Sequence, residues 1–206
     1  MTKKSAWTLT QLSLENAEQW LEDAKMLIGK GSYGHANALL RFSLEELAKA
    51  WVCWQVSKEI MPENSKPYRD VFKYHIMKTQ VILAFIRPPV VRAEEATDEE
   101  IIKWWDKVKA LPELMEEYRK SCIYVGRANK EGQIHSPKEV RKEETEGLQS
   151  RTENLLKFVM SLVISSHPEY EKRLKDAYAS LPKDAWKTGE IPREHLGRLT
   201  KVLSHD

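Results

Sequence analysis

The chain has 206 residues, of which 41% are hydrophobic and 31% are charged, and it contains only eight glycines. This composition is typical of a helix-rich globular protein, and it excludes collagen-like, low-complexity and disulfide-dense classes. Lys and Arg number 33 against 31 Asp and Glu, and the formal net charge of +2 excludes a globally basic nucleic-acid-binding protein, so any basic surface must be local.

The first two predicted elements are long helices. Apolar residues at helical spacing, between capping signals at each end, predict a helix over residues 13–31. A second helix is expected over residues 33–60, because its central stretch, Leu39–Trp54, has eleven apolar residues among sixteen and no Gly or Pro. Such a helix belongs in the middle of a bundle. The face expected to be buried consists of Ala36, Leu40, Leu47, Ala50 and Trp54.

A third helix is predicted from about Tyr68 to Ile86, where two prolines end it. His75 lies on the apolar stripe of this helix, so its side chain is expected to be buried. The commoner role of a histidine in such a position is a hydrogen bond to a backbone carbonyl, and a catalytic role is the alternative.

Thr97 and Glu100 form a capping box that predicts the start of a fourth helix. Pro112 is expected to restart or kink this helix, which then continues to about residue 125. Arg119 lies at the edge of the predicted buried stripe, and Tyr124 lies near the end of the helix.

The rest of the chain is predicted to be helical apart from one polar loop. The expected segments are the loop at 126–135, a long helix at 136–165, and short helices at 169–180 and 193–203. No segment shows the alternation of a β-strand. The expected fold is therefore all-α: an antiparallel bundle of four to five core helices over residues 1–166, followed by a C-terminal helical appendage over residues 167–206.

Cys53 and Cys122 are the only cysteines, and both fall in predicted apolar helical stretches. Two buried thiols without CxxC spacing suit a reducing compartment and do not indicate zinc or a redox site. The first twenty residues do not resemble a signal peptide, and no apolar run is long enough to span a membrane. A cytoplasmic protein that needs no metal and no cofactor is expected.

No phosphate-binding loop, zinc-protease motif or nucleophile elbow occurs, so any chemistry must come from side chains scattered over several helices. An acid, lysines, an imidazole, a guanidinium and a phenol can bind a phosphate and move protons without a metal. We expect four of these side chains to share one pocket, although an exposed ion pair is the plainer explanation of a Glu–Lys spacing. The candidates are Glu45, Glu46, Lys49, His75, Lys78, Arg119 and Tyr124, and the four expected to meet are Glu46, Lys49, His75 and Arg119.

A local basic region adds a second candidate feature. Residues 119–142 contain seven Lys or Arg and two Glu. The interpretation is a phosphodiester-binding lip that includes Arg127, Lys130 and His135, and the alternative is an ordinary solvated surface.

Three segments, GSYGHANALLRFSLEELAKA, FKYHIMK and YRKSCIYVG, resemble the AbiV family of abortive-infection proteins, which belongs to the HEPN superfamily of helical bundles. The resemblance covers roughly residues 14–165. Its recurring elements correspond here to Glu45, Glu46 and Lys49, to His75 and Lys78, and to Ile123-Tyr124-Val125 after Arg119. It implies a HEPN-like bundle, a role in antiphage defence and a homodimer.

Many HEPN proteins resemble metal-independent endoribonucleases whose signature is Arg, four to six residues, and His. Here four residues lead from Arg119 to Tyr124, and seven separate Arg127 from His135. Two readings therefore stay open. One is an RNA-cleaving toxin that uses Arg119, Tyr124, His75 and Glu46, with RNA as its partner. The other is a non-catalytic module that binds a phage or host protein or a nucleotide-like ligand.

The tandem Trp104-Trp105 supports an interface, because adjacent helical residues point about 100° apart and one core cannot easily bury both rings. One ring is expected to meet either a second copy of the chain or the C-terminal appendage.

Overall fold

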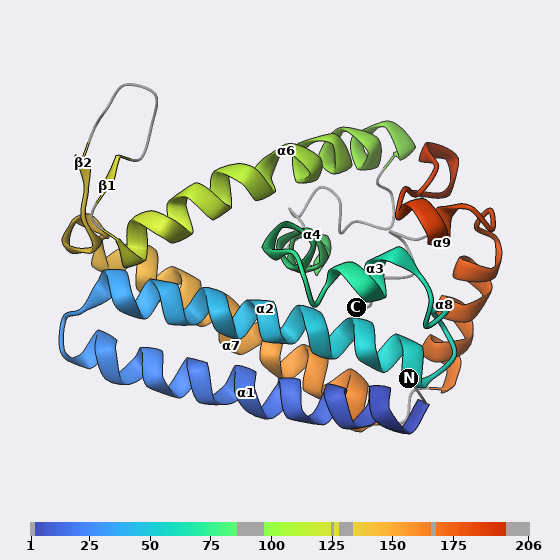
Figure 1. Ribbon diagram of the computed structural model, residues 1–206, viewed down its shortest axis with the longest axis horizontal. Coiled ribbons are helices and arrows are strands. Elements are labelled where there is room, and N and C mark those ends of the chain that lie inside the picture. The colour runs from blue at the N-terminus through green and yellow to red at the C-terminus, as the bar shows by residue number, and fades with distance from the viewer. Residues whose placement is uncertain (1–2, 86–96, 125, 128–133, 166–167, 197–206) are drawn as a thin grey trace.

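The computed structural model describes residues 3–85, 97–124, 126–127, 134–165 and 168–196. The fold is all-α, as predicted. Three long helices, α1 (Lys3–Gly29), α2 (Tyr33–Ser57) and α7 (Lys142–Ile164), pack alongside one another, and α4 (His75–Phe85) lies between α2 and α6 (Asp98–Ile123) (Figure 1). The shorter elements are α3 (Lys66–Asp70), β1 (Gly126–Arg127), β2 (Ile134–His135), the 3-10 helix η1 (Pro137–Glu139), α8 (Pro168–Ala179) and α9 (Ala185–Thr188).

Helix α2 is the centre of the bundle, since it packs against α1, α4, α6 and α7. The predicted face is confirmed: Ala36, Leu40, Leu47, Ala50 and Trp54 are all fully buried. Both cysteines are buried free thiols, as expected.

Helix α1 is longer than predicted, because it begins at Lys3 rather than at Ser13. Residues 3–12 contain no Gly or Pro, and the buried Ala6 and Thr10 continue the inward-facing spacing of the later residues. The Thr10 hydroxyl also donates to the carbonyl of Ala6 at 3.0 Å, so its polar group is satisfied inside the helix.

The predicted third helix is interrupted, and the expectation that His75 is buried is wrong. Helix α3 ends at Asp70, whose carbonyl accepts the amides of Lys73 and Tyr74, and α4 begins only at His75. This turn resets the helical phase, so the stripe that starts at Tyr68 does not reach His75. The His75 side chain is 45% exposed.

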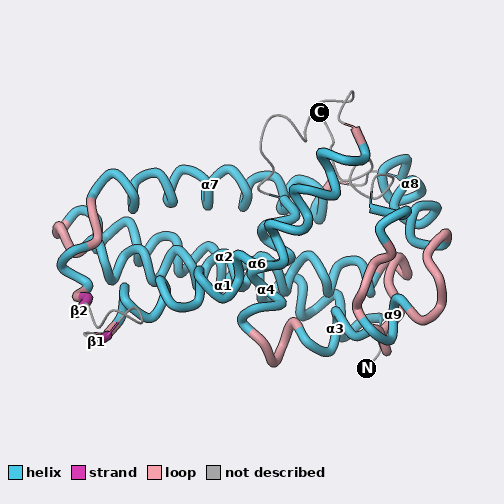
Figure 2. The backbone as a smooth tube through the Cα atoms, turned by 90° about the horizontal axis from the view of Figure 1, so that it is seen from above, coloured by secondary structure: helices cyan, strands magenta, loops and turns pink. Residues whose placement is uncertain are grey.

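Helix α6 begins with the predicted capping box between Thr97 and Glu100 and continues as one helix through Pro112, so the restart that was one of the two expectations there does not occur. The predicted polar loop is in part a hairpin, since Gly126 pairs with His135 and Arg127 with Ile134. This hairpin lies at the end of the bundle opposite to α8 and α9 (Figure 2).

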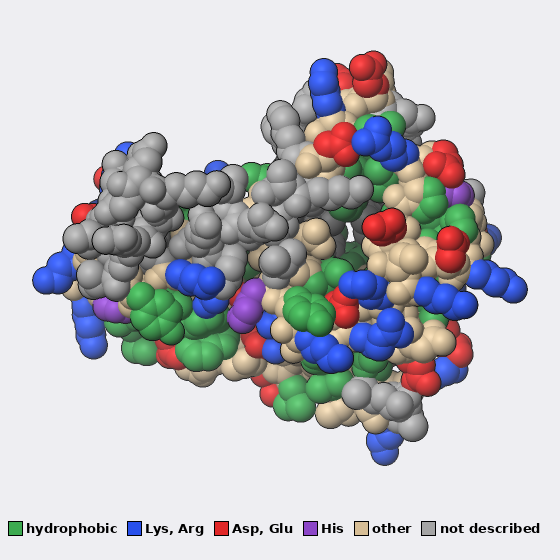
Figure 3. Space-filling model, turned by 45° about the horizontal axis from the view of Figure 1, so that its top comes forward, with side chains coloured by type: hydrophobic (Ala, Val, Ile, Leu, Met, Phe, Trp, Pro, Cys, Tyr) green, Lys and Arg blue, Asp and Glu red, His purple; other side chains and the backbone are tan. Residues whose placement is uncertain are grey.

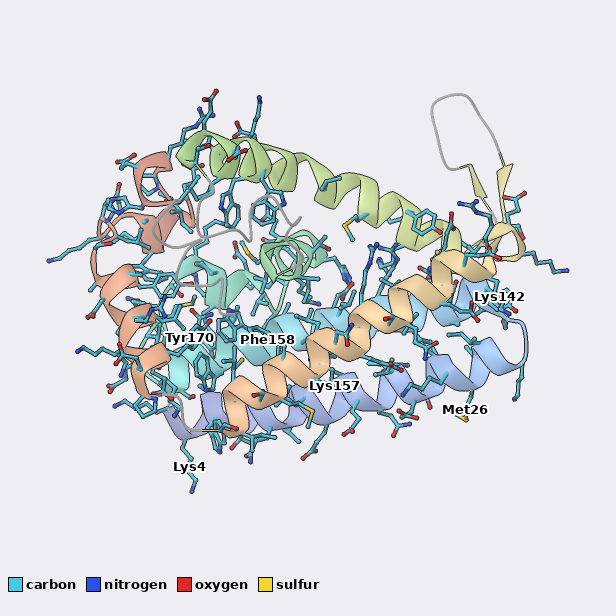
Figure 4. The ribbon with its side chains drawn as sticks, turned by 180° about the vertical axis from the view of Figure 1, so that it is seen from behind. Lys4, Met26, Lys142, Lys157, Phe158 and Tyr170 are labelled. Carbon is cyan, nitrogen blue, oxygen red and sulfur yellow. The ribbon has the colours of Figure 1, made fainter. Side chains whose placement is uncertain are left out.

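The C-terminal segments pack onto the bundle. Tyr170 and Leu174 of α8 belong to the same buried cluster as residues of α1, α2 and α7. Phe158 of α7 packs against this cluster, near Tyr170 (Figure 4). Trp104 packs with Ile101 and with Leu196, so the C-terminal region covers one ring of the tandem pair. Residues 193–196 are helical, and the rest of the helix predicted to reach residue 203 lies outside the described residues.

Candidate functional site

The carboxylate of Glu45 connects α2 to α4. Its Oε2 atom lies 2.8 Å from Nδ1 of His75 and 3.3 Å from Nζ of Lys78. Glu45 and Lys78 are 8% and 9% exposed, so a buried acid is satisfied by a buried base. Position 78 follows position 75 by three residues, which places both side chains on the same side of α4.

The Glu45 contact determines how His75 can act. An ionised carboxylate only accepts hydrogen bonds, so the Nδ1–H of His75 is the donor. In the neutral imidazole this leaves Nε2 as a proton acceptor, on a ring that is 45% exposed. A carboxylate-oriented imidazole that reaches solvent is the arrangement of a general base.

Glu46 pairs with Lys49, one of its expected partners, but it is not the acid that contacts His75. It forms an ion pair with Lys49 three residues later on the same helix, and the two side chains are 14% and 20% exposed. The acid that contacts His75 is instead Glu45, its neighbour in sequence. The structure thus brings Glu45, His75 and Lys78 together, and it places Glu46 and Lys49 in a separate pair on α2.

A row of polar side chains at four-residue spacing runs along α2: Asn37, Arg41, Glu45 and Lys49. We call it the α2 ridge. Residues four apart lie one above another on a helix, so Arg41 is one turn away from Glu45. The Nε of Arg41 donates to Oδ1 of Asn37 at 3.0 Å, and its guanidinium stacks on the ring of Tyr118 at 4.8 Å. This stack fixes the direction of the Arg41 side chain.

Arg119 contacts the residue that follows Arg41 on α2. Its guanidinium is over the ring of Phe42 at 5.8 Å. Burial lowers the pKa of Arg41 from its ordinary value, and the positive charge of Arg119 acts in the same direction. Two like charges held together repel each other, and an anion between them would relieve that repulsion. The pair is therefore a candidate phosphate clamp.

A cavity of about 350 Å³ opens beside Arg41. Tyr118 lines it and donates to Oε2 of Glu144 at 2.9 Å, and Glu144 in turn binds Arg141. Burial, followed by the bond to Glu144, raises the pKa of the Tyr118 phenol, so Tyr118 stays a neutral donor at physiological pH. Neither Asn37 nor Arg41 was among the sequence candidates. Counting back from Glu45 in steps of four would have found both.

The remaining candidates lie away from these contacts or outside the description. Tyr124 caps the C-terminal end of α6 with its side chain 64% exposed, and in the described part of the chain its hydroxyl makes no hydrogen bond to Glu45 or His75. The backbones of Arg127 and His135 belong to the hairpin. Lys130 lies outside the described residues.

Among the described residues, no three or more His, Cys, Asp or Glu side chains lie close enough together to hold a metal ion. Over the same residues, none of the helices combines the length and apolarity that a membrane crossing requires.

Comparison with known proteins gives one family match. The family model HEPN_AbiV, described as AbiV, matches residues 6–156. This range contains the α2 ridge, His75, Lys78 and Arg119, and it ends within α7. No curated protein and no solved structure matches the chain.

Proposed function

Because this chain belongs to the AbiV family of HEPN proteins, we propose that it acts in abortive infection by binding RNA and cleaving it without a metal. The family supports the HEPN-type abortive-infection role. The proposal of RNA as the target rests on one observation: Glu45 orients the imidazole of His75, and Arg41 lies one helical turn away from Glu45 on α2.

The positive charges come from different helices. Arg41 is on α2, Arg119 on α6, and Lys78 on α4. Guanidinium groups bind the oxygens of a phosphate in a planar, bidentate manner, and a stacked guanidinium loses little side-chain entropy when it does so. Arg41 and Arg119 would hold the scissile phosphate, and Lys78 would hold the carboxylate of Glu45 in place.

Exposed aromatic side chains support a single-stranded substrate. Phe72 and Tyr74, in the turn directly before His75, are 41% and 56% exposed. Bases of single-stranded RNA stack on such rings whatever their sequence. On the face drawn in Figure 3, basic, histidine and hydrophobic side chains lie next to one another. A strand whose phosphate meets the arginines would have bases within reach of this turn.

The proposed reaction is an internal transesterification. Nε2 of His75 takes the proton of a ribose 2′-hydroxyl, and the 2′-oxygen forms a bond to phosphorus. The bond from phosphorus to the 5′-oxygen breaks, and that oxygen takes a proton from solvent. The products are a 2′,3′-cyclic phosphate and a free 5′-hydroxyl. Arg119 would stabilise the charge that develops on the phosphoryl oxygens.

The test is an incubation of purified protein with synthetic single-stranded RNA in EDTA. We expect cleavage with 2′,3′-cyclic ends, which His75→Ala and Arg119→Gln abolish while the far-UV circular dichroism stays unchanged. Lys157→Ala is the control, because Lys157 is an exposed cation on the rear of the molecule (Figure 4). Activity that requires Mg²⁺, or that survives Arg119→Gln, would contradict this mechanism.

A second function has its own supporting observation. The exposed Tyr124 follows Arg119 where the family signature would have His, so a second proton-transfer group beside the arginines is missing from that position. In a non-catalytic module the same arginines would hold RNA, a nucleotide-like ligand or an acidic partner protein. Binding of RNA without cleavage, abolished by Arg119→Gln, would select this function.

We also propose that the protein works in the cytoplasm as a homodimer. Exposed apolar side chains such as Leu12, Met26 and Ile164 offer contact surface among the described residues. A mass of about 48 kDa by light scattering, twice the 24.0 kDa of the chain, is the expected result. A monomer at micromolar concentration would contradict the dimer alone.

A further inference from the structure

A second cavity is lined in part by residues of α8 and α9. These two helices lie at the end of the molecule away from the hairpin (Figure 2). The volume of the cavity is about 170 Å³. The walls come from the C-terminal half of α2, from α4 and α6, and from residues 178–191. The wall residues that matter for the argument are Trp51, Gln55, Met77, Trp105 and Trp186.

The cavity is apolar and aromatic. Three tryptophans and a tyrosine line it, together with two methionines, and none of its described wall residues is charged. Tyr178 and Trp186 pack ring against ring at 5.2 Å and form one wall. Such walls favour a flat, uncharged molecule, since neither a phosphate nor an ammonium group would find a counter-charge inside.

Two glutamines, Gln55 and Gln80, line the cavity, and Gln55 is the buried one. Its side chain is 1% exposed, and its Oε1 atom has no hydrogen-bond partner. Buried amide oxygens are almost always bonded to protein, water or ligand, so an unpartnered one at a cavity needs an explanation. The terminal torsion of a glutamine is soft, so the amide group of Gln55 can rotate to meet a donor in the cavity.

We propose that this cavity binds a small uncharged aromatic molecule of one or two rings that carries an N–H donor for Gln55. The volume agrees with this class, because an apolar cavity of about 150 Å³ accommodates a benzene ring. The rings would lie among the tryptophans, and the N–H would satisfy the one open acceptor. Met77 adds an adaptable wall that can fit rings of different shape.

This cavity is separate from the proposed RNA site, and the proposal for it does not depend on the proposed RNA cleavage. Tyr178, Leu181, Ala185, Trp186, Gly189 and Ile191 line the cavity, and all follow residue 156, where the family match ends. The closing wall therefore belongs to this chain's own C-terminal segment rather than to the region that the family shares.

Indole and benzofuran provide a matched pair of probes, because they have the same shape and only indole has the N–H. Isothermal titration of the full-length protein should show indole binding about three- to tenfold more tightly than benzofuran, the range expected for one hydrogen bond. Gln55→Leu keeps the size of the side chain and removes the oxygen. In this variant the two affinities should become equal, through loss of indole affinity alone.

Trp186→Ala is the control for the cavity itself and should weaken both probes by a similar factor. Melting curves establish that each variant is folded, and Gln55→Leu should melt no lower than the parent because it removes an unpartnered polar group. Three results would overturn the proposal: neither probe binds at millimolar concentration, both bind equally to the parent protein because Gln55 holds only water, or the preference for indole persists in Gln55→Leu.

Discussion

Nδ1 of His75 lies 2.8 Å from Oε2 of Glu45, a residue thirty positions earlier in the chain. This bond joins the first residue of α4 to the middle of α2, and Lys78 reaches the same oxygen atom. The orientation of His75 therefore depends on the packing of two helices. A change in that packing would misdirect the imidazole before it unfolded the bundle.

Glu45→Gln should destabilise the protein and remove its activity, whereas Glu46→Gln should do neither. The first change leaves the ammonium of Lys78 buried beside a neutral amide, which costs about 1–3 kcal/mol. The second removes an ion pair within one helix turn, worth about 0.2–0.5 kcal/mol. Urea unfolding and RNA cleavage measure the two effects. Equal losses from both changes would mean that Glu45 has no special role.

Arg41→Lys should weaken binding of single-stranded RNA by about tenfold at constant salt, because an ammonium cannot reproduce a stacked, bidentate contact. The slope of log K against log salt should stay the same, since the charge is kept. Arg41→Gln should lower that slope by about 0.7, the value for one phosphate contact on a single strand.

Arg173→Lys, the same change at an exposed position on α8, is the control for the Arg41 variants and should alter neither quantity. If the slope is unaffected by Arg41→Gln, then Arg41 does not contact a phosphate.

The buried face of α2 was predictable from sequence because it depends only on helical periodicity within one unbroken helix. The exposure of His75 was not, since the turn at residues 71–74 depends on where Asp70 ends α3. Glu45 and Glu46 could not be separated either. They point about 100° apart, and the choice between them depends on where α4 packs. The hairpin that pairs Gly126 with His135 was not predictable either, because strands of two residues are too short to show an alternation of polar and apolar side chains.

Gly34→Ala should destabilise the protein by about 1–3 kcal/mol. A Cβ atom at this position would overlap the backbone carbonyl of Pro137, which packs closely against the start of α2. Gly147→Ala is the matched change in α7, where a Cβ atom meets nothing within 4 Å. That change should stabilise the protein by about 0.5–1 kcal/mol through helix propensity. Thermal or urea unfolding distinguishes the two, and effects of the same sign would contradict the close approach.

The free energy of unfolding should fall as the pH rises from about 9 to about 12. Burial raises the pKa of the Cys53 thiol from 9.0 to about 12, and burial likewise raises the pKa of the Tyr68 phenol from 10.0 to about 12. In this window the unfolded chain releases protons that the folded chain keeps, so alkali favours unfolding. Below pH 9 both states hold these protons, and neither group contributes a slope.

Cys53→Ala should reduce the decline over the whole window from pH 9 to 12, and Tyr68→Phe should reduce it from pH 10 to 12. Urea unfolding at intervals of one pH unit measures both. If neither substitution changes the fall in the free energy of unfolding, other titrating groups cause it.

The burial of Tyr170 and Leu174 in the main core has a consequence for how this protein can be divided. The region shared with the family ends at residue 156, yet the core is completed by side chains that follow it. The stretch that the family model matches is thus shorter than the stretch that forms the buried core. A fragment cut at the shared boundary would lose the last turns of α7 and the two α8 side chains together, and would expose the apolar surface that they cover. Transplanting the shared region into another protein would therefore require a substitute for α8.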